Sequence, residues 1–313
     1  MKRVLIIGAN GQDGVHLRRQ LLGHECEIWS ISRDKLWKEQ AMESLDFSIL
    51  DRTAVDHFFQ THPPDELYYL AAYHHSSQDR SLVGESELWA NSMRVHVDGW
   101  RNCLEALSRH APSCRAFYAA SSHLFGKPLH SPQNEETPFQ PESTYGLTKL
   151  YGVELARYFR RRGCFISVGI LYNHESPQRA PQFVSQKIVK GLCEVVRGQS
   201  NQIELLNLSA QVDWGYVPDF VEAMRLILQH DKPDDYVVAT GELHSVGEFA
   251  QQACAKLGLN FSLVVKESGG ALPSSFSPAI TLRGDNSKLR RATGWKPKIN
   301  FSQMVDKLLS ERI

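Results

Sequence analysis

The stretch Val4-Leu5-Ile6-Ile7-Gly8-Ala9-Asn10-Gly11-Gln12-Asp13-Gly14 decides the fold of this chain. Its four apolar residues predict a short buried strand, and three glycines spaced three apart follow directly. In such a turn the first glycine permits the tight bend, the second lets a pyrophosphate approach the backbone, and the third packs helix against strand. The helix that starts there offers free N–H groups to phosphates. The stretch therefore predicts a dinucleotide site. The alternative is a tight strand-to-helix turn without a ligand.

Beyond this turn, short apolar segments alternate with segments of helical length. The pattern predicts strands at residues 4–7, 27–31, 67–72, 115–121 and 165–171, and a further strand near 45–49. It predicts helices at residues 12–22, 53–61, 88–108 and 144–162. Strands that alternate with helices imply a parallel sheet covered on both faces, so we expect an α/β, doubly wound Rossmann fold.

The second half of the chain is less regular. Helices are predicted at residues 219–229 and 246–257, the latter with Ser245 as its N-cap, and a strand at 236–240. We expect residues 1–171 and about 211–240 to form a dinucleotide-binding domain, the second of these stretches returning to the main sheet. Residues of about 172–210 and 241–313 would then form a smaller, C-terminal substrate-binding lobe.

The charge of the chain excludes two classes of partner. Its 313 residues hold 35 Lys and Arg and 35 Asp and Glu, so the formal net charge is +0 and gives no case for nucleic acid or membrane binding. One basic cluster lies at the end of the helix predicted over 144–162. We expect it to be a solvated helix end, where cations suit the helix dipole. The cluster consists of Arg157, Arg160, Arg161 and Arg162.

Targeting and metal-binding patterns are also missing from the sequence. No run of about 18 apolar residues exists, and the N-terminus lacks the pattern of a signal peptide. The 6 cysteines form no Cys-x-x-Cys pair, which argues against a zinc site and a disulfide framework. We therefore expect a cytoplasmic protein with reduced thiols and no metal.

The end of the second predicted strand indicates the cofactor. An acidic residue there would hold the ribose diol of NAD, whereas Arg33 could clamp a 2′-phosphate and favours NADP. Asp34 follows Arg33 and keeps NAD as the alternative. Asp51, after the third predicted strand, is a candidate for the adenine edge. The full set of candidate cofactor residues is Gly8, Asn10, Gly11, Gln12, Asp13, Gly14, Arg33, Asp51, Leu70, Ala71, Ala72, Tyr145 and Lys149.

A Tyr and a Lys four residues apart supply candidate catalytic groups. Tyr145 and Lys149 share one face of a predicted helix, and an ammonium near a phenol lowers the phenol pKa from its reference near ~10. Lys149 could also hold the nicotinamide ribose. Ser121 and Ser122 end the fifth predicted strand, at the sheet edge where ligands bind, and a hydroxyl there can bind the oxygen that Tyr145 deprotonates. The sequence therefore predicts hydride chemistry at a carbon that bears oxygen.

These residues resemble the extended short-chain dehydrogenase/reductase family, also described as NAD-dependent epimerases and dehydratases, and within it the GDP-mannose 4,6-dehydratases. The Gln12-Asp13 pair inside the glycine turn is typical of that branch. So are four later motifs: NHESP at residues 173–177, DWG at 213–215, ATGELHSV at 239–246 and GWKP at 294–297. The resemblance covers nearly the whole chain.

The resemblance implies an internal redox cycle on a nucleotide sugar. Tyr145 would deprotonate the C4 hydroxyl while a hydride leaves C4 for NADP. The C4 ketone acidifies the C5 hydrogen, a base removes it, water leaves from C6, and the hydride returns to C6. Asn173 and Lys187 match family positions that bind the nucleotide diphosphate.

Three departures from the family bear on substrate and assembly. The family's Thr-Ser-Glu is Ser121-Ser122-His123 here, so a neutral imidazole would remove the proton in place of a carboxylate. Val212 and Ser277 stand where the family has arginines, which leaves the sugar nucleotide open. The segment after Arg33 is shorter than the one that helps to build the family's tetramer. We therefore expect a homodimer through the helices at 88–108 and 144–162.

Three functions follow from this comparison. The first is an NADP-dependent 4,6-dehydratase of GDP-mannose or a related GDP-hexose. The second is an NAD(P)-dependent reductase or epimerase of a 4-keto sugar nucleotide, which needs no glutamate and is favoured by His123. The third is a non-catalytic nucleotide-binding protein, which the missing arginines permit.

Overall fold

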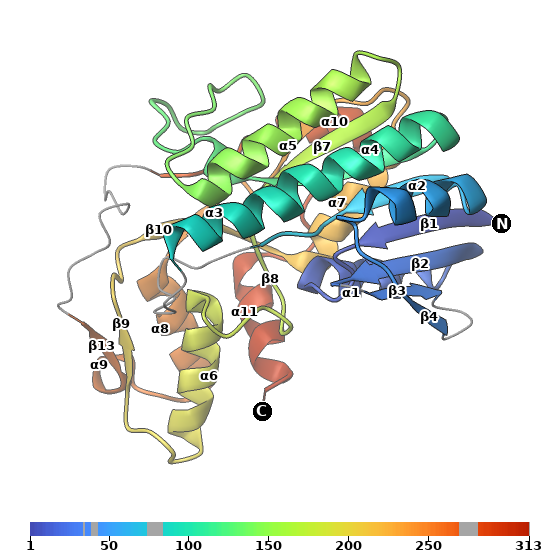
Figure 1. Ribbon diagram of the computed structural model, residues 1–313. Helices are drawn as coiled ribbons and strands as arrows, with labels where there is room; N and C mark the ends of the chain where they lie inside the picture. Colours follow the sequence, from blue (N-terminus) through green and yellow to red (C-terminus); the bar gives the residue numbers. More distant parts are fainter. Residues whose placement is uncertain (34, 39–42, 74–83, 269–280, 313) are drawn as a thin grey trace.

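The computed structural model describes residues 1–33, 35–38, 43–73, 84–268 and 281–312 (Figure 1). Within these ranges the main sheet has eight strands in the order β11-β7-β6-β5-β1-β2-β3-β4. The six strands from β11 to β2 are parallel. They are β1 (Lys2–Ile7), β2 (Cys26–Ser32), β5 (Glu66–Tyr69), β6 (Arg115–Ser121), β7 (Phe165–Leu171) and β11 (Asp235–Val238).

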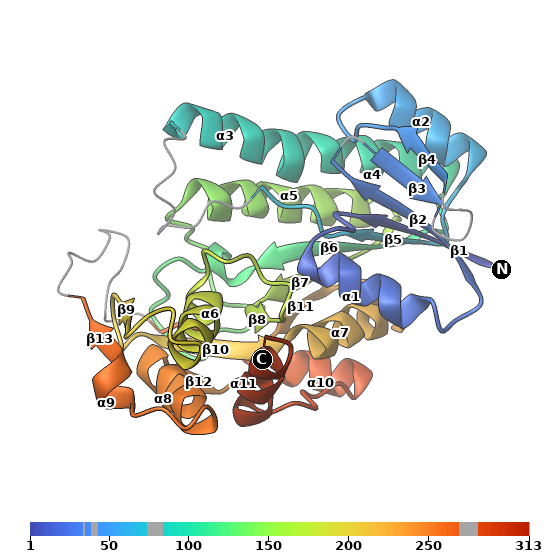
Figure 2. The same cartoon turned by 90° about the horizontal axis from the view of Figure 1, so that it is seen from below.

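Helices cover both faces of this sheet, as Figure 2 shows. Side chains alternate along β1: Val4 and Ile6 pack against one set of helices, Leu5 and Ile7 against the other. Burial on both faces explains why the strand is apolar throughout. The first set is α1 (Gln12–Leu21), α7 (Val217–Gln229) and α10 (Ser287–Thr293); the second is α2 (Arg52–Thr61), α4 (Gly99–His110) and α5 (Thr144–Arg160). Helix α3 (Glu85–Met93) lies against α5. The doubly wound α/β prediction is confirmed.

Two local predictions were wrong, and a third was right but incomplete. The strand expected near 45–49 is β4 (Glu43–Asp46), which forms an antiparallel edge hairpin with the unpredicted β3 (Lys35–Lys38). Phe47 and Ile49 are buried in the core without joining the sheet, which made the pattern resemble a strand. The strand expected over 67–72 ends at Tyr69. The single helix expected over 88–108 is α3, a π-turn (Arg94–Asp98) and α4.

A smaller lobe has its own apolar core below the carboxyl edge of the sheet. Its sheets are β8 (Asn173–Glu175), β10 (Gln211–Tyr216) and β12 (Leu243–Ser245), and separately β9 (Ile203–Leu205) with β13 (Val265–Glu267). Its helices are α6 (Val184–Val196), α8 (Val246–Lys256), α9 (Phe261–Val264) and α11 (Phe301–Ser310). Ser245 caps α8 through a capping box with Glu248.

The predicted return of residues 211–240 to the main sheet is right only for its second part. Helix α7 and strand β11 lie with the main sheet, whereas β10 pairs with β8 and β12 and places Trp214 in the core of the smaller lobe. This pairing brings the end of β8 to the chain segment that leads into α7. The functional division into a dinucleotide domain and a substrate lobe stays a prediction.

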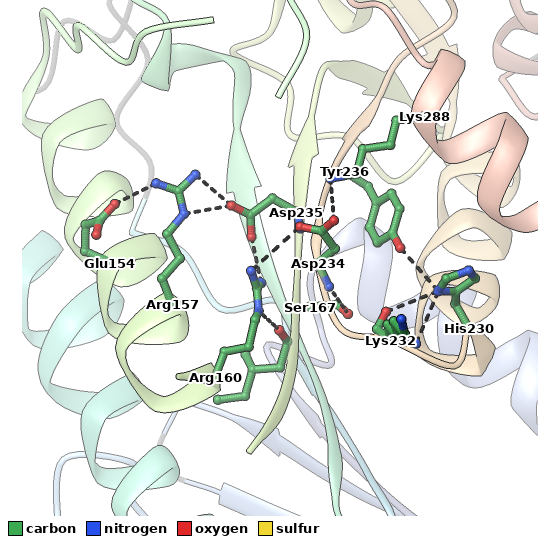
Figure 3. A network of polar contacts seen from close by, with 11 residues as sticks. Glu154, Arg157, Arg160, Ser167, His230, Lys232, Asp234, Asp235, Tyr236 and Lys288 are labelled. Carbon is green, nitrogen blue, oxygen red and sulfur yellow. Dashed lines mark hydrogen bonds and ion pairs between the residues drawn. The ribbon is translucent and has the colours of Figure 1, made fainter. Parts of the chain in front are cut away.

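The arginine cluster at the end of α5 is not simply a solvated helix end (Figure 3). Arg157 Nε and Arg160 Nη2 each donate to the buried carboxylate of Asp235, both at 2.7 Å. Arg160 Nε also donates to the carbonyl of Ile166 at 2.7 Å. Only Arg161 and Arg162 are exposed as expected. Arg157 and Arg160 connect helix α5, which carries the candidate catalytic residues, to the edge strand β11.

Two further expectations concern thiols and membranes. All six cysteines are buried free thiols, because each lies in one of the apolar cores or against a strand. Among the described residues, no helix combines the length and apolar character that crossing a membrane requires. In the same ranges, no group of three or more His, Cys, Asp and Glu side chains is placed to hold a metal.

Candidate functional site

The glycine turn lies at the carboxyl edge of the sheet, where strand order reverses. Strand β1 pairs with β2 on one side and β5 on the other, and in open parallel sheets ligands bind at such a switch point. Gly8 has φ +92°, and a Cβ there would lie 2.6 Å from the backbone nitrogen of Ala71. The turn therefore touches the segment Leu70–Ala72, which the sequence also assigned to the cofactor. A side chain at Gly14 would meet Ala9 Cα at 2.5 Å, so this glycine packs helix against turn.

The first turn of α1 fits the phosphates of a dinucleotide. Gly11 is exposed, and a Cβ placed on it would meet only the carbonyl of Gly8, at 3.3 Å. In the described part of the chain, no side chain caps the N-terminus of α1. Its N–H groups and positive dipole end therefore face the space beside Asn10 and Gly11. These features fit the predicted cofactor.

The residues assigned to the adenine end have partly structural roles. Asp51 Oδ1 accepts hydrogen bonds from the backbone of Thr53 and Ala54, each at 3.0 Å, and so caps α2. Arg33 directly follows β2, has a left-handed backbone with φ 53°, and is exposed. Asp34 lies outside the described residues. Contact of Asp51 and Arg33 with a cofactor stays a prediction.

The side chains of Gln12 and Asp13 bind the NHESP segment. Gln12 Nε2 donates to the carbonyl of His174 at 3.0 Å, and Gln12 Oε1 accepts from the Ser176 hydroxyl at 3.1 Å. Asp13 Oδ1 lies 3.0 Å from His174 Nε2. The sequence assigned both residues to the cofactor, and that contact stays a prediction. Their side chains join the turn after β1 to strand β8.

His174 must be an imidazolium. Its Nδ1 faces the carbonyl of Tyr172 at 2.7 Å and its Nε2 faces the carboxylate of Asp13, so both ring nitrogens must donate. Burial alone would lower the pKa of His174, but the charge and hydrogen bond of Asp13 raise it above its ordinary value. Burial alone would raise the pKa of Asp13, but His174 lowers it. The result is a buried ion pair between α1 and β8.

Tyr145 and Lys149 lie in the first two turns of α5, which Ser143 caps at the backbone of Gly146. Lys149 is buried and its Nζ donates to the carbonyl of Ala119 at 2.7 Å. The same Nζ is 5.9 Å from the centre of the Tyr145 ring. Burial lowers the pKa of Lys149 to about 7. Lys149 therefore changes its charge near neutral pH, and the charge of the Asp13 carboxylate opposes part of the fall in its pKa.

The prediction that the pKa of Tyr145 is lowered was wrong for the protein without a bound ligand. Burial raises the pKa of Tyr145 to about 12, opposed by the charge of Arg179 and by a hydrogen bond with Ser121. Lys149 lends little positive charge because its own pKa falls on burial. Ser121 ends β6 and is buried beside the phenol, as predicted from its place in the strand. Ser122 is also buried and begins a short 3-10 turn (Ser122–Leu124).

His123 follows on that turn and faces Tyr145. The two ring centres are 5.6 Å apart and the planes stand at 83°. His123 is exposed at the surface. Loss of solvation among the surrounding protein groups lowers the pKa of His123, and the positive charge of Arg179 lowers it further. A neutral imidazole beside a phenol is suited to accept a proton.

The candidate substrate residues lie in the smaller lobe. Asn173 begins β8 and is exposed, next to the locked His174. Lys187 lies on α6 and is also exposed. Val212, one of the two positions where an arginine was expected, is partly buried against the core of this lobe. Ser277 lies outside the described residues. Binding of a nucleotide by Asn173 and Lys187 stays a prediction.

Sequence reasoning missed Arg179 as a member of the site. Its guanidinium lies 3.7 Å from the centre of the Phe183 ring, and its Nε is 3.6 Å from Glu175 Oε2. Its charge lowers the pKa of both Tyr145 and His123. Its place two residues after the NHESP motif was the one signal in the sequence. Its effect on groups more than 30 residues away could come only from the fold.

Comparison with known proteins gives the family of the chain. A family model described as GDP-mannose 4,6 dehydratase matches residues 5–308. The chain belongs to the GDP-mannose 4,6-dehydratase family. A GDP-mannose 4,6 dehydratase of Drosophila melanogaster is 33% identical and covers 100% of this chain and 86% of the relative. A GDP-mannose 4,6 dehydratase 2 of Arabidopsis thaliana is 35% identical and covers 99% of this chain and 86% of the relative.

Solved structures at low identity share the fold of this family member. RMD from Pseudomonas aeruginosa, complexed with NADPH, has a TM-score of 0.82 at 21% identity and covers 99% of both chains. A dTDP-glucose 4,6-dehydratase from Bacillus anthracis, in complex with NAD, has a TM-score of 0.79 at 15% identity. The match covers 99% of this chain and 96% of that one. Both neighbours bind a nicotinamide dinucleotide: the first is in complex with NADPH and the second with NAD.

Proposed function

We propose that this chain is a 4,6-dehydratase of GDP-mannose or a related GDP-hexose, with NADP as its dinucleotide. The observation that carries the proposal is the meeting of Ser121, His123 and Tyr145 at the carboxyl edge of the sheet in a chain of this family. An enzyme of this class needs a hydroxyl that holds a sugar oxygen, a phenol that moves its proton and a separate base. The three residues supply those groups.

The dinucleotide would be held by the turn after β1 and by the first turn of α1. When bound there, the nicotinamide supplies a reversible acceptor of hydride. The exposed Arg33 at the end of β2 supports NADP over NAD, because a guanidinium can bind a 2′-phosphate through two hydrogen bonds. Asp51 keeps one carboxylate oxygen away from its capping bonds, which suits the proposed adenine contact.

The protein's own part in the reaction is to position the sugar and move protons. Ser121 orients the Tyr145 hydroxyl, so that this hydroxyl can exchange a proton with the C4 oxygen of the sugar. His123 stays neutral because its pKa is lowered, and so it can take the proton from C5 once C4 is a ketone. Lys149 fixes the end of β6 through Ala119 and remains able to take up a proton near neutral pH.

The nucleotide end of the substrate would lie over the smaller lobe. Asn173 and Lys187 are exposed there, with an amide and an ammonium that suit a diphosphate. We assign residues 1–171, with α7 and β11 from the stretch 211–240, to dinucleotide binding, and the smaller lobe, which includes β10 but not α10, to the substrate. The strand β10, which pairs within the smaller lobe, connects the two parts.

We also propose a homodimer through α3 and α5. Leu147, Tyr151 and Tyr158 form one exposed apolar row along α5, with 45%, 54% and 44% of each residue accessible. Trp89, 43% accessible, lies on the neighbouring helix α3. Light scattering of Tyr151→Glu combined with Tyr158→Glu should show a monomer. Leu129→Glu, at an 87% exposed loop position, is the matched control and should leave the dimer intact.

A second function is favoured by one residue. His123 replaces the carboxylate on which the family's elimination depends, and a reductase or epimerase of a 4-keto sugar nucleotide would need only Tyr145, Lys149 and a serine. Mass spectrometry of products from GDP-, UDP-, CDP- and dTDP-hexoses distinguishes the two. We expect a product lighter by one water from a GDP-hexose. Inversion without loss of water, or consumption of one reduced dinucleotide per sugar, would establish the second function.

A further inference from the structure

We infer that His96 is a positioning residue of the site: a neutral imidazole, protonated on Nδ1, that ties the segment after β5 to the helix that holds Tyr145 and Lys149. His96 is fully buried in the π-turn Arg94–Asp98 between α3 and α4. The sequence assigned no role to it. The tie itself stands on geometry alone, whereas its effects on NADP affinity and on turnover rest on the proposed function.

The π-turn around His96 is built into the core. A π-turn disturbs the regular helical pairing of carbonyls, and two strand tyrosines approach the carbonyls here. The Tyr69 hydroxyl donates to the carbonyl of Val95 at 2.5 Å, and the Tyr118 hydroxyl to that of His96 at 3.4 Å. The next residue after the turn is Gly99, and a larger residue would not fit there because a Cβ would lie 2.8 Å from the Tyr69 hydroxyl. The ring of His96 is therefore held in one place.

The contacts of the ring fix its protonation. The backbone N–H of Tyr73 donates to His96 Nε2 at 3.0 Å, so Nε2 must be the unprotonated nitrogen. The proton is then on Nδ1, which donates to the Thr148 hydroxyl at 2.8 Å. That hydroxyl donates in turn to the carbonyl of Thr144 at 2.8 Å. The Thr148 hydroxyl also lies 3.2 Å from the carbonyl of Tyr145, so each donor in this series of hydrogen bonds has an acceptor. A proton on Nε2 would place two N–H groups against each other.

The chain of bonds joins the two halves of the candidate site. Tyr73 directly follows Leu70–Ala72, the segment that touches Gly8 in the proposed dinucleotide site. Thr148 lies between Tyr145 and Lys149, and the rings of His96 and Tyr145 meet edge to face with centres 5.4 Å apart. His96 thus sets the distance between the dinucleotide segment and the phenol. An error of about 1 Å in such a distance is enough to slow catalysis by about 100-fold.

The test combines nitrogen NMR with binding. In protein labelled with 15N-histidine, the signals missing from the His96→Phe variant identify His96, and we expect one protonated and one unprotonated nitrogen, with the proton on Nδ1. The His96→Phe variant should bind NADP about tenfold more weakly, because the Tyr73 N–H loses its acceptor. His96→Gln, which keeps an acceptor, should recover part of that loss. Thr148→Val should lower kcat with a smaller change in NADP affinity.

Matched controls separate a positioning role from a general loss of stability. His110→Gln removes a ring at the end of α4 that binds Asp56 at 3.0 Å, away from the site, and should change neither NADP affinity nor kcat. A folded His96→Phe protein with unchanged NADP affinity, or a proton found on Nε2, would overturn the inference. Tautomer and binding are measured without a sugar. Absence of dehydration by the parent protein would therefore contradict the proposed function and leave this inference standing.

Discussion

Helix α5 carries Tyr145 and Lys149 at one end and Arg157 and Arg160 at the other, and the two ends treat charge in opposite ways. At the carboxyl edge of the sheet, Lys149 donates to the carbonyl of Ala119 at 2.7 Å, and burial lowers its pKa to about 7 although the charge of Asp13 opposes the shift. At the far end, two guanidiniums hold the buried carboxylate of Asp235 at 2.7 Å each. The charges of Arg157, Arg160 and Asp235 are therefore paired at the far end of α5, whereas Lys149 can gain or lose a proton at the sheet edge.

The difference separates buried charged groups that stabilise the fold from buried groups that can take part in catalysis. A carboxylate with two well-placed guanidiniums keeps its charge, and removal of one partner leaves the others buried without compensation. A buried amine or phenol without an opposite charge changes its pKa instead. Groups of the second kind gather where reactions occur. Four substitutions test the comparison, and they are arranged by the size of the expected effect.

The largest effect is expected at the phenol. Tyr145→Phe removes the hydroxyl that exchanges a proton with the sugar, and should lower kcat by about 10³-fold. The midpoint of thermal unfolding should stay within a few degrees, because the ring and its packing remain. Product formation and thermal unfolding of the same preparation measure both. A folded variant with turnover close to that of the parent would remove Tyr145 from the mechanism.

At the other end of the helix, Asp235→Ala should destabilise the protein by about 3 kcal/mol, because Arg157 and Arg160 lose their shared partner. Urea unfolding measures the change, and turnover per folded molecule should be unaffected. Glu154→Gln is the control: this exposed carboxylate binds Arg157 at 2.8 Å, and its loss should cost no more than about 0.5 kcal/mol. Equal losses in the two variants would contradict the contrast between the ends.

Lys149→Met should have the opposite sign on stability. The pKa of Lys149 falls from 10.5 to about 7 on folding, so the parent gains stability as pH rises from about 7 toward 10.5. Replacement by an apolar side chain of similar length should stabilise the fold at neutral pH by about 1–2 kcal/mol. Urea unfolding at several pH values should show that the advantage of the variant shrinks in alkali. A variant less stable than the parent at pH 7 would show that the ammonium contributes to the fold.

The ion pair of His174 and Asp13 should give the smallest effect, of about 1 kcal/mol. The raised pKa of His174 means that its contribution is complete below 6.5 and is lost as pH rises through the raised value. The lowered pKa of Asp13 means that its contribution is complete above 3.8 and is lost in stronger acid. Relative to His174→Gln, the parent should therefore lose stability above neutral pH. A difference that does not vary between pH 5 and 9 would contradict the imidazolium assignment.

Local sequence signals predicted the turn after β1, the strand that ends at Ser121 and the helix that carries Tyr145 and Lys149. Each of these is fixed by residues within a few positions of one another. The side-chain partners of Asp13, His96 and Arg160 lie 161, 52 and 75 residues away, so no local pattern could have given them. The prediction of a lowered pKa for Tyr145 failed for a related reason, because the pKa depends on how the whole site buries the phenol. The edge hairpin β3–β4 was missed because the buried Phe47 and Ile49 gave a stronger strand pattern.

The central claim is that Tyr145 serves an internal transfer of hydride from C4 to C6 of the same sugar. GDP-mannose labelled with deuterium at C4 tests it most directly, with NADP present and the product analysed by mass spectrometry. We expect a product that has lost one water and kept the deuterium, with no net formation of reduced dinucleotide. Deuterium recovered in the dinucleotide, one for each sugar consumed, would contradict it.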